Sequence, residues 1–199
     1  MADCRLLLIR HGLIKANRQQ VWHGSTDSQL LRRGRGQARR LARALETEEL
    51  TAIVASPLRR CVDTAAPLAQ NTDLEVEVDE RLREWSVGEW EGKPYRWLHE
   101  EHDFFDVTTK DPEFAPPEGE SLRQVAERMV EALQDISQRY HDGARVAVVT
   151  HGAATAVAVA ALLDGDPTLW RNYSFINCGV SELVLDSGPP YLSSYNEMF

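Results

Sequence analysis

Three short loops of the sequence carry side chains that could bind and transfer an anion. Each loop follows a short apolar run, and the loops read, in chain order, Arg10-His11-Gly12, Ser56-Pro57-Leu58-Arg59-Arg60 and His151-Gly152. Arginine offers a planar fork of N–H donors that matches phosphate oxygens, and it keeps its charge. Histidine can serve near neutral pH as a nucleophile or a proton donor. These residue types favour chemistry on a phosphate group.

The apolar runs before these loops predict buried strands of a parallel sheet. They cover residues 5–9, 51–55 and 145–149, and continuous apolar runs are typical of strands covered on both faces. Helical spacing of apolar residues or helix-start signals predict helices at 35–50, after Ser56-Pro57 to about Gln70, and at 120–140. Two closing strands are predicted at 180–185 and 191–195. Because ligands bind beyond the carboxyl ends of parallel strands, we expect the three loops to lie together.

Strands that alternate with helices predict an α/β fold in one domain, residues 1–199. We expect a three-layer sandwich with a largely parallel central sheet and helices on both faces. The stretch at about 88–119 is aromatic, then acidic, then proline-rich, and it interrupts the alternation. It predicts an insertion that lies over one edge of the sheet as a lid.

Charge and cysteine content exclude several classes of partner and location. Asp and Glu number 31 against 22 Lys and Arg, so the net charge of −9 argues against nucleic-acid binding. Cys4, Cys61 and Cys178 show no C-x-x-C spacing, which argues against a disulfide framework or a cysteine-rich zinc site. The three thiols fit a reducing, cytoplasmic location. Monomer and homodimer both stay open.

One long uncharged segment, Val146–Leu163, is the candidate for a membrane span. Thr150-His151-Gly152 interrupts the segment, and much of its remainder is alanine. A strand, a turn and a buried helix explain it better than a span, so we expect no membrane partner. The apolar run Leu6–Ile9 before Arg10 is also too short for a signal peptide.

Five ordered blocks carry a resemblance to a known family. They are Leu8-Ile9-Arg10-His11-Gly12 with Asn17; Gly24, Asp27, Leu30, Gly34, Gln37 and Ala38; Ser56-Pro57-Leu58-Arg59-Arg60 with Thr64-Ala65; Leu82-Arg83-Glu84 with Gly88-Glu89-Trp90-Glu91-Gly92; and Val148-Val149-Thr150-His151-Gly152. In these residues nearly the whole chain resembles the histidine phosphatase superfamily. That group includes cofactor-dependent phosphoglycerate mutases and small broad-range phosphatases.

The resemblance implies a role for each matching residue. His11 would be the nucleophile, phosphorylated during turnover, and Glu84 the general acid and then the base that activates water. The phosphoryl oxygens would be bound by Arg10, Arg60, His151 and Asn17, with Gly152 beside them. His23 stands where relatives often have Ser or Thr, so it can add a polar contact. No metal or cofactor is implied, because arginines already supply positive charge where phosphoryl transfer needs it.

Several neighbouring residues have a structural interpretation. Family spacing selects Arg60 rather than Arg59, which we expect to be exposed. His99, His102 and Asp103 lack a third well-placed metal ligand and are interpreted as surface residues. Cys61 is predicted to lie in the core, and Trp85 and Trp90 to pack beneath or beside the site. A solvated helix face is predicted for the arginines at 32, 33, 35, 39, 40 and 43.

Departures from the family pattern favour hydrolysis over phosphate transfer. Mutases typically place an acidic residue where Leu13 stands, and a longer basic insertion between the two positions matched by Glu84 and His151. Here the insertion is short and mostly acidic. We therefore expect a phosphoric monoester hydrolase acting on small phosphorylated metabolites, such as a sugar phosphate or a phosphoglycerate. The alternatives are a phosphoglycerate-type phosphomutase, a phosphoprotein phosphatase, and a binding protein without turnover.

Overall fold

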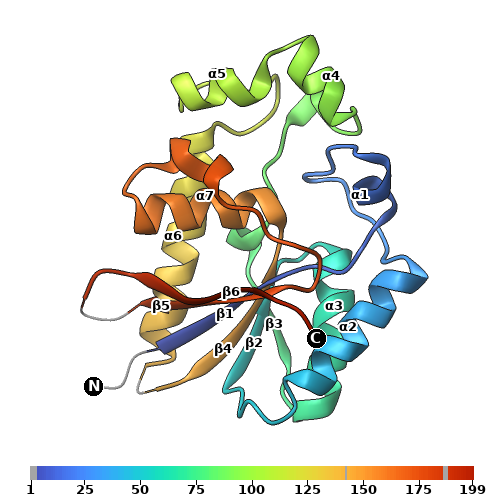
Figure 1. The fold of residues 1–199 in the computed structure, drawn as a ribbon, viewed down its shortest axis with the longest axis vertical. Helices are drawn as coiled ribbons and strands as arrows, with labels where there is room; N and C mark the ends of the chain where they lie inside the picture. The colour runs from blue at the N-terminus through green and yellow to red at the C-terminus, as the bar shows by residue number, and fades with distance from the viewer. Residues whose placement is uncertain (1–3, 142, 186–187) are drawn as a thin grey trace.

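A mixed sheet forms the centre of the computed structural model, which describes residues 4–141, 143–185 and 188–199 (Figure 1). In the described residues the strand order is β3-β2-β4-β1-β5-β6. The strands are β1 Cys4–Arg10, β2 Ala52–Ala55, β3 Val76–Val78, β4 Arg145–Thr150, β5 Val180–Leu185 and β6 Tyr191–Glu197. Strands β1 to β4 are parallel, β5 runs antiparallel to β1, and β6 runs antiparallel to β5. The predicted, largely parallel sheet is confirmed.

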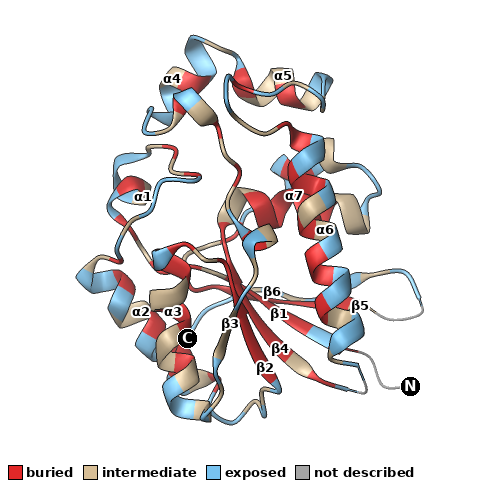
Figure 2. Cartoon of the chain, turned by 180° about the vertical axis from the view of Figure 1, so that it is seen from behind, coloured by how far each residue is buried: buried red, intermediate tan, exposed pale blue. Residues whose placement is uncertain are grey.

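Helices cover both faces of this sheet, which confirms the three-layer sandwich (Figure 1). Helices α2 (Arg32–Ala44) and α3 (Arg59–Thr72) pack on one face, and α6 (Leu122–Arg139) and α7 (Gly152–Leu163) on the other. Side chains alternate along each strand, so one strand serves both layers. Leu7 of β1 belongs to the core beneath α2 and α3, and Leu8 to the core beneath α6 and α7. Figure 2 shows the central strands as buried and the outer helix faces as exposed, whereas the edge strands β3 and β6 have no buried residue.

The parallel register brings the three predicted loops to one edge of the sheet. Strand β4 lies between β2 and β1, and Arg10 pairs with Thr150 at the ends of their strands. The backbone N–H groups of His11 and Ser56 donate to the carbonyl oxygens of Thr150 and Val149, each at 2.9 Å. The expected meeting of these loops is therefore confirmed.

The two helices on the second face also follow the sequence patterns. Ser121 caps α6, since its hydroxyl accepts from the Gln124 N–H at 3.2 Å and the Gln124 side chain accepts from the Ser121 N–H at 2.8 Å. The segment Val146–Leu163 forms β4, a turn and the buried helix α7, as predicted. None of the helices in the described part of the chain is long and apolar enough to cross a membrane.

Short elements connect the layers, and the sequence patterns did not predict them. They are α1 (Lys15–Gln19), η1 (Glu80–Leu82), η2 (Gly88–Trp90), α4 (Tyr95–Glu100), α5 (Phe104–Lys110) and η3 (Pro167–Asn172). Elements η2, α4 and α5 belong to the expected insertion, and α4 and α5 lie away from the sheet, at the top of Figure 1. The role of this segment as a lid stays a prediction.

Candidate active site

A cavity of about 280 Å³ opens at the carboxyl edge of the sheet, between the strand loops and the short helices. Six of the predicted site residues line it: Arg10, His11, Asn17, His23, Glu84 and Gly152. Arg60 and His151 are fully buried and do not line it. The structure thus places six of the predicted residues at the cavity wall, and Arg60 and His151 behind His11.

A hydrogen bond of its ring fixes the tautomer of His11, and hydrogen bonds of the backbone fix its loop. The imidazole Nδ1 lies 2.8 Å from the carbonyl oxygen of Gly12, which can only accept, so Nδ1 carries the proton. The Nε2 atom is then left with a free lone pair. The loop itself is held by Thr64, whose hydroxyl accepts from the Gly12 N–H at 2.9 Å, and by Asn177, whose amide donates to the His11 carbonyl at 2.8 Å.

The surroundings also keep His11 uncharged. Burial, followed by the positive charges of Arg60 and Arg10, holds the pKa of His11 well below its ordinary value of 6.5. An imidazole that is neutral at physiological pH and exposes Nε2 has the form that a nucleophile needs.

His151 lies directly behind His11, with their ring centroids 5.3 Å apart and the rings edge to face. Its Nδ1 accepts from Arg60 Nε at 3.2 Å, so its Nε2 carries the proton and donates to the Ser56 hydroxyl at 2.8 Å. Burial and the charge of Arg60 hold the pKa of His151 well below 6.5. The two imidazoles are therefore both neutral.

Arg60 uses its donors on protein groups. Besides the bond to His151, its guanidinium donates to the backbone carbonyls of Thr26 at 2.8 Å, Gly24 at 2.7 Å and His23 at 3.1 Å. It fixes the loop 23–26 against the two histidines. Four of its five N–H groups are used in this way, which leaves one N–H of Nη1 without a protein acceptor among these bonds.

Arg10 presents an unused donor at the cavity wall. One of its terminal nitrogens donates to the Phe175 carbonyl at 2.6 Å, while Nε is buried and has no hydrogen-bond partner among the described residues. Nδ1 of His23, on the same cavity, is buried and unpartnered too. Buried polar atoms are rarely left unpaired, because each loses its hydration without compensation. Two of them beside His11 point to a ligand with oxygen atoms.

Gly152 lets Arg10 approach the start of α7. A Cβ atom at this position would lie 3.1 Å from both Nε and the central carbon of the Arg10 guanidinium. A side chain here would push the guanidinium away from the cavity wall.

Asn17 offers a further donor. Its Oδ1 accepts from the Ile14 N–H and from the Asn177 amide, both at 3.2 Å. These bonds fix the side-chain amide, so its NH2 group is the part available to the cavity that the residue lines.

Glu84 caps helix α7 from outside the helix. One carboxylate oxygen, Oε1, accepts from the N–H groups of Ala154 at 2.7 Å and Trp85 at 2.9 Å, and Oε2 accepts from the Ala153 N–H at 3.1 Å. No side chain at the N-cap position, His151, performs this role. These bonds place the carboxyl group at the start of α7, where Gly152 also allows Arg10 to approach. Oε2 accepts one hydrogen bond and Oε1 two, so Oε2 is the oxygen with more free lone pairs.

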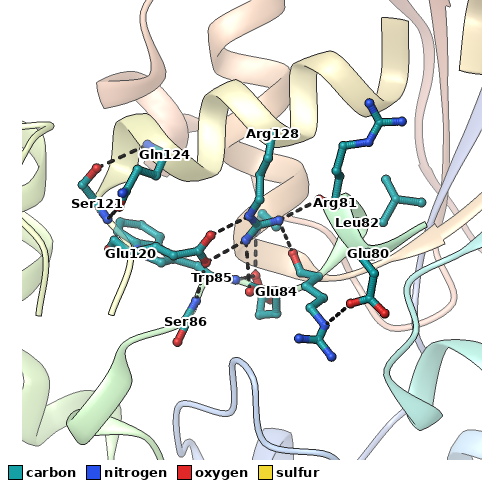
Figure 3. Close-up of polar contacts among 12 residues, drawn as sticks. Glu80, Arg81, Leu82, Glu84, Trp85, Ser86, Glu120, Ser121, Gln124 and Arg128 are labelled. Atoms are coloured by element: carbon teal, nitrogen blue, oxygen red, sulfur yellow. Dashed lines mark hydrogen bonds and ion pairs between the residues drawn. The ribbon is translucent and has the colours of Figure 1, made fainter. Parts of the chain in front are cut away.

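The backbone before Glu84 is held by Arg128 of α6, which sequence reasoning missed (Figure 3). The Arg128 guanidinium donates to the carbonyls of Arg81 at 2.8 Å, Arg83 at 2.7 Å and Glu84 at 3.2 Å. It also forms a two-bond ion pair with Glu120, at 2.6 and 2.8 Å. Its carbonyl partners lie over forty positions away in the chain, so no local pattern could have identified it.

Glu91 holds the loop that carries His23, and sequence reasoning matched this residue without assigning it a role. Its carboxylate accepts from the N–H groups of Gly24 at 2.9 Å and Ser25 at 3.0 Å, and from the Thr26 hydroxyl at 3.0 Å. Gly24 is needed here, because a Cβ would lie 2.1 Å from the Trp85 carbonyl oxygen.

The structural interpretations of Arg59, Cys61 and the α2 arginines are confirmed. Arg59 is exposed and pairs with Asp63 at 3.6 Å, and Cys61 is fully buried. Trp85 and Trp90 are both buried, and Trp85 packs against Trp22 and Trp170 of the cavity lining. Burial raises the pKa of the Cys61 thiol to about 12. All six α2 arginines singled out in the sequence are exposed. His102 stacks on Trp90 with centroids 4.1 Å apart, and the described residues contain no group of three or more His, Cys, Asp or Glu placed to hold a metal.

Comparisons with known proteins agree with this geometry. The family model described as histidine phosphatase superfamily (branch 1) matches residues 6–198. A putative phosphoserine phosphatase 2 of Hydrogenobacter thermophilus is 33% identical over 198 residues, 98% of this chain and 96% of that protein. A probable phosphoglycerate mutase of Cronobacter sakazakii is 30% identical over 93% of this chain and 86% of that protein. The solved structure of a mycobacterial glucosyl-3-phosphoglycerate phosphatase with VO3 superposes with a TM-score of 0.86 at 31% identity, over 96% of this chain and 98% of that one.

Proposed function

The chain belongs to branch 1 of the histidine phosphatase superfamily and is a phosphoric monoester hydrolase, and from this premise we propose that it hydrolyses small phosphorylated metabolites through a phosphohistidine at His11. One observation carries the proposal. His11 is neutral, its Nδ1 is bound to a carbonyl, and it lines a cavity beside the unpartnered Nε–H of Arg10. A nucleophile and an anion donor thus meet in one place.

The first half of the reaction transfers the phosphoryl group to the protein. The phosphoryl oxygens bind Arg10 Nε–H and the Asn17 amide, and His11 Nε2 attacks phosphorus as the bond to the leaving oxygen breaks. Donors already in place offset the negative charge spread over the phosphoryl oxygens in the transition state. The acid form of Glu84 gives its proton to the leaving oxygen, which departs as an alcohol.

The second half returns the protein to its starting state. Glu84, now a carboxylate, takes a proton from water as the water oxygen attacks phosphorus and the bond to Nε2 breaks. Inorganic phosphate leaves, and Glu84 again holds its proton. The backbone N–H groups of Ala153 and Ala154 keep the carboxyl group in place through both steps.

The size of the cavity supports a small substrate. A volume of about 280 Å³ is just below the range of roughly 300–1,000 Å³ that is usual for ligand sites. Two relatives carry the names of phosphoserine and glucosyl-3-phosphoglycerate phosphatases, both acting on esters of small metabolites. A phosphoprotein would have to present its phosphorylated residue to this small cavity.

A panel of phosphate monoesters, assayed in excess chelator for released phosphate, tests the reaction. We expect release from at least one ester at the same rate with and without chelator. Movement of phosphate within one substrate, without release, would instead assign a mutase, the activity for which one similar protein is named. Release from no ester would contradict the proposal.

Trapping the intermediate tests the nucleophile. Acid-labile, base-stable label from a phosphate ester is expected on the protein and should be absent in His11→Asn. The matched control is His141→Asn, an exposed histidine at the far end of α6, which should keep both label and activity. Label that survives acid, or activity in His11→Asn, would overturn the assignment.

A cytoplasmic location is proposed as well. Cys4, Cys61 and Cys178 are all buried free thiols. Burial raises the pKa of Cys178, like that of Cys61, to about 12, so these thiols are unreactive and fit a reducing compartment.

A further inference from the structure

We propose that the cavity selects phosphate esters whose leaving group is uncharged and presents a flat or apolar face, and rejects leaving groups with a second carboxylate or phosphate. The inference rests on the proposed function and names the substrate class of the same site. It follows from the half of the cavity that the phosphoryl group does not need.

That half of the cavity is an aromatic wall. Six aromatic side chains line the cavity: Trp22, Tyr95, Phe105, Trp170, Tyr173 and Phe175. The ring of Trp22 lies edge to face with that of Tyr95, their centroids 5.7 Å apart, and 6.3 Å from that of Phe105, which lies 6.2 Å from Trp170. These four rings are therefore in mutual contact, and Tyr173 and Phe175 line the same cavity. Aromatic faces of this kind stack on sugar rings and on planar groups.

The aromatic wall offers no positive charge to a second anion. Arg10 is the only lysine or arginine among the lining residues, and it lies at the phosphoryl end beside His11. The nearby Arg171 does not line the cavity, and its guanidinium is paired with Asp106 at 2.9 Å. Lys93 is also outside the cavity, 5.1 Å from the ring centroid of Trp97.

The charge of the whole chain also disfavours a second anion, because the net charge is −9. A carboxylate of the substrate would lose hydration against the aromatic wall and find only neutral donors there, such as the unpartnered Nε1–H of Trp170, and no cation. Burying a charge without an opposite charge beside it is costly. We expect this to lower kcat/KM at least about tenfold, since a tenfold change needs only about 1.4 kcal/mol.

Matched pairs of esters test the inference. Glycerol 3-phosphate and 3-phosphoglycerate differ only in a hydroxymethyl group against a carboxylate, and phenyl phosphate and 4-carboxyphenyl phosphate differ only in a carboxylate. The uncharged member of each pair should have the higher kcat/KM, by at least about tenfold. Equal values, or a preference for the charged members, would overturn the inference.

A binding measurement separates this inference from the proposed function. Phenylphosphonate and 4-carboxyphenylphosphonate cannot be hydrolysed, and the tryptophans of the aromatic wall report their binding by fluorescence. If no ester is hydrolysed but phenylphosphonate binds at least about tenfold more tightly, the proposed function fails and the inference stands. Equal binding of the two phosphonates sinks the inference even when esters are hydrolysed.

Adding a positive charge to the aromatic wall provides a test with variants. Tyr95→Arg and, separately, Tyr173→Lys place a cation in the aromatic wall. Each should raise the ratio of kcat/KM for 3-phosphoglycerate over glycerol 3-phosphate at least about tenfold. Tyr191→Arg, on the exposed face of β6, carries the same charge change outside the cavity and should leave the ratio unchanged. An unchanged ratio in both cavity variants, with circular dichroism showing that they are folded, would contradict the inference.

Discussion

At the scale of single residues, two polar atoms without partners mark the site more clearly than the charged groups around them. Arg10 Nε and His23 Nδ1 are both buried, unpartnered and beside the nucleophile. Arg60, by contrast, has the charge that the family pattern calls for but spends its donors on four protein acceptors. Its contribution here is the positive potential that helps to keep both histidines neutral.

Replacing Gly152 by alanine tests how closely Arg10 must approach. The added Cβ would lie 3.1 Å from the guanidinium, so Arg10 must shift and its donor leaves the phosphoryl group. We expect kcat/KM to fall at least about tenfold, the loss of one charged hydrogen bond in the transition state.

Gly36→Ala in α2 is the matched control, because the atom nearest to its added Cβ lies 3.7 Å away, at the end of the flexible Arg40 side chain. Alanine should stabilise that helix by roughly 0.5–1 kcal/mol and leave the rate unchanged. Steady-state kinetics and urea unfolding give both values. Full activity in Gly152→Ala would show that Arg10 does not need this approach.

At the scale of elements, helix α6 positions the proposed acid without touching the substrate. Arg128 of α6 donates hydrogen bonds to three backbone carbonyls before Trp85 and pairs with Glu120, which precedes the helix (Figure 3). Glu120 in turn accepts from the Ser86 N–H at 2.9 Å, so the backbone is hydrogen-bonded both before and after Glu84.

Arg128→Met should therefore reduce kcat more than it changes KM. The carbonyls lose a shared donor and the carboxyl of Glu84 becomes less well placed, which we expect to lower kcat roughly tenfold or more. Arg128→Lys keeps the charge but loses the planar fork, so it should recover only part of the rate.

Arg123→Met is the matched control for this loss, since Arg123 lies on the same helix and its ion pair with Glu113 is exposed. Its kinetics should stay those of the unaltered protein. A change confined to KM in Arg128→Met would point to substrate binding instead of positioning of the acid.

Elements that are long or buried were predictable from the sequence, and short exposed ones were not. Strands β1, β2 and β4 read as apolar runs because sheet and helices cover both of their faces. Helix α4 has six residues and η3 has six, fewer than two turns of an α-helix, so neither offers a repeated spacing to recognise. Three of the six aromatic residues of the wall, Tyr95, Phe105 and Trp170, lie in short helices. The sequence therefore showed that aromatic residues are present but did not predict how they are arranged.

At the scale of the whole molecule, buried neutral histidines link stability to pH. The pKa of His11 is well below 6.5 in the folded protein because of burial and of Arg60 and Arg10. Below about pH 6.5 the unfolded chain binds a proton at this residue and the folded chain does not, so stability falls as the pH falls.

His11→Asn should weaken this pH dependence. Between pH 6.5 and 5.5 the unaltered protein is expected to lose about 1 kcal/mol more of its free energy of unfolding than the variant. Urea unfolding followed by circular dichroism at several pH values provides the comparison. Equal losses in the two proteins would mean that His11 takes up its proton in the folded state.

The choice of site residues also depended on the whole molecule. Arg10, His11, Asn17 and Glu84, which the family spacing singles out, line one cavity, and the parallel register carries the loops after β1 and β4 to one edge. The spacing did not show that Arg60 and His151 lie behind that cavity, since depth depends on how the loop 23–26 folds over them.

The aromatic wall and the sheet loops draw on different stretches of the chain. Phosphoryl chemistry is anchored to β1, β4 and the start of α7, whereas Tyr95, Phe105 and Tyr173 come from α4, α5 and the end of η3. Mutations in the latter can thus retune preference while leaving the hydrolytic machinery intact. Such an architecture lends itself to evolutionary divergence, because selection can exchange one alcohol for another without rebuilding the catalyst.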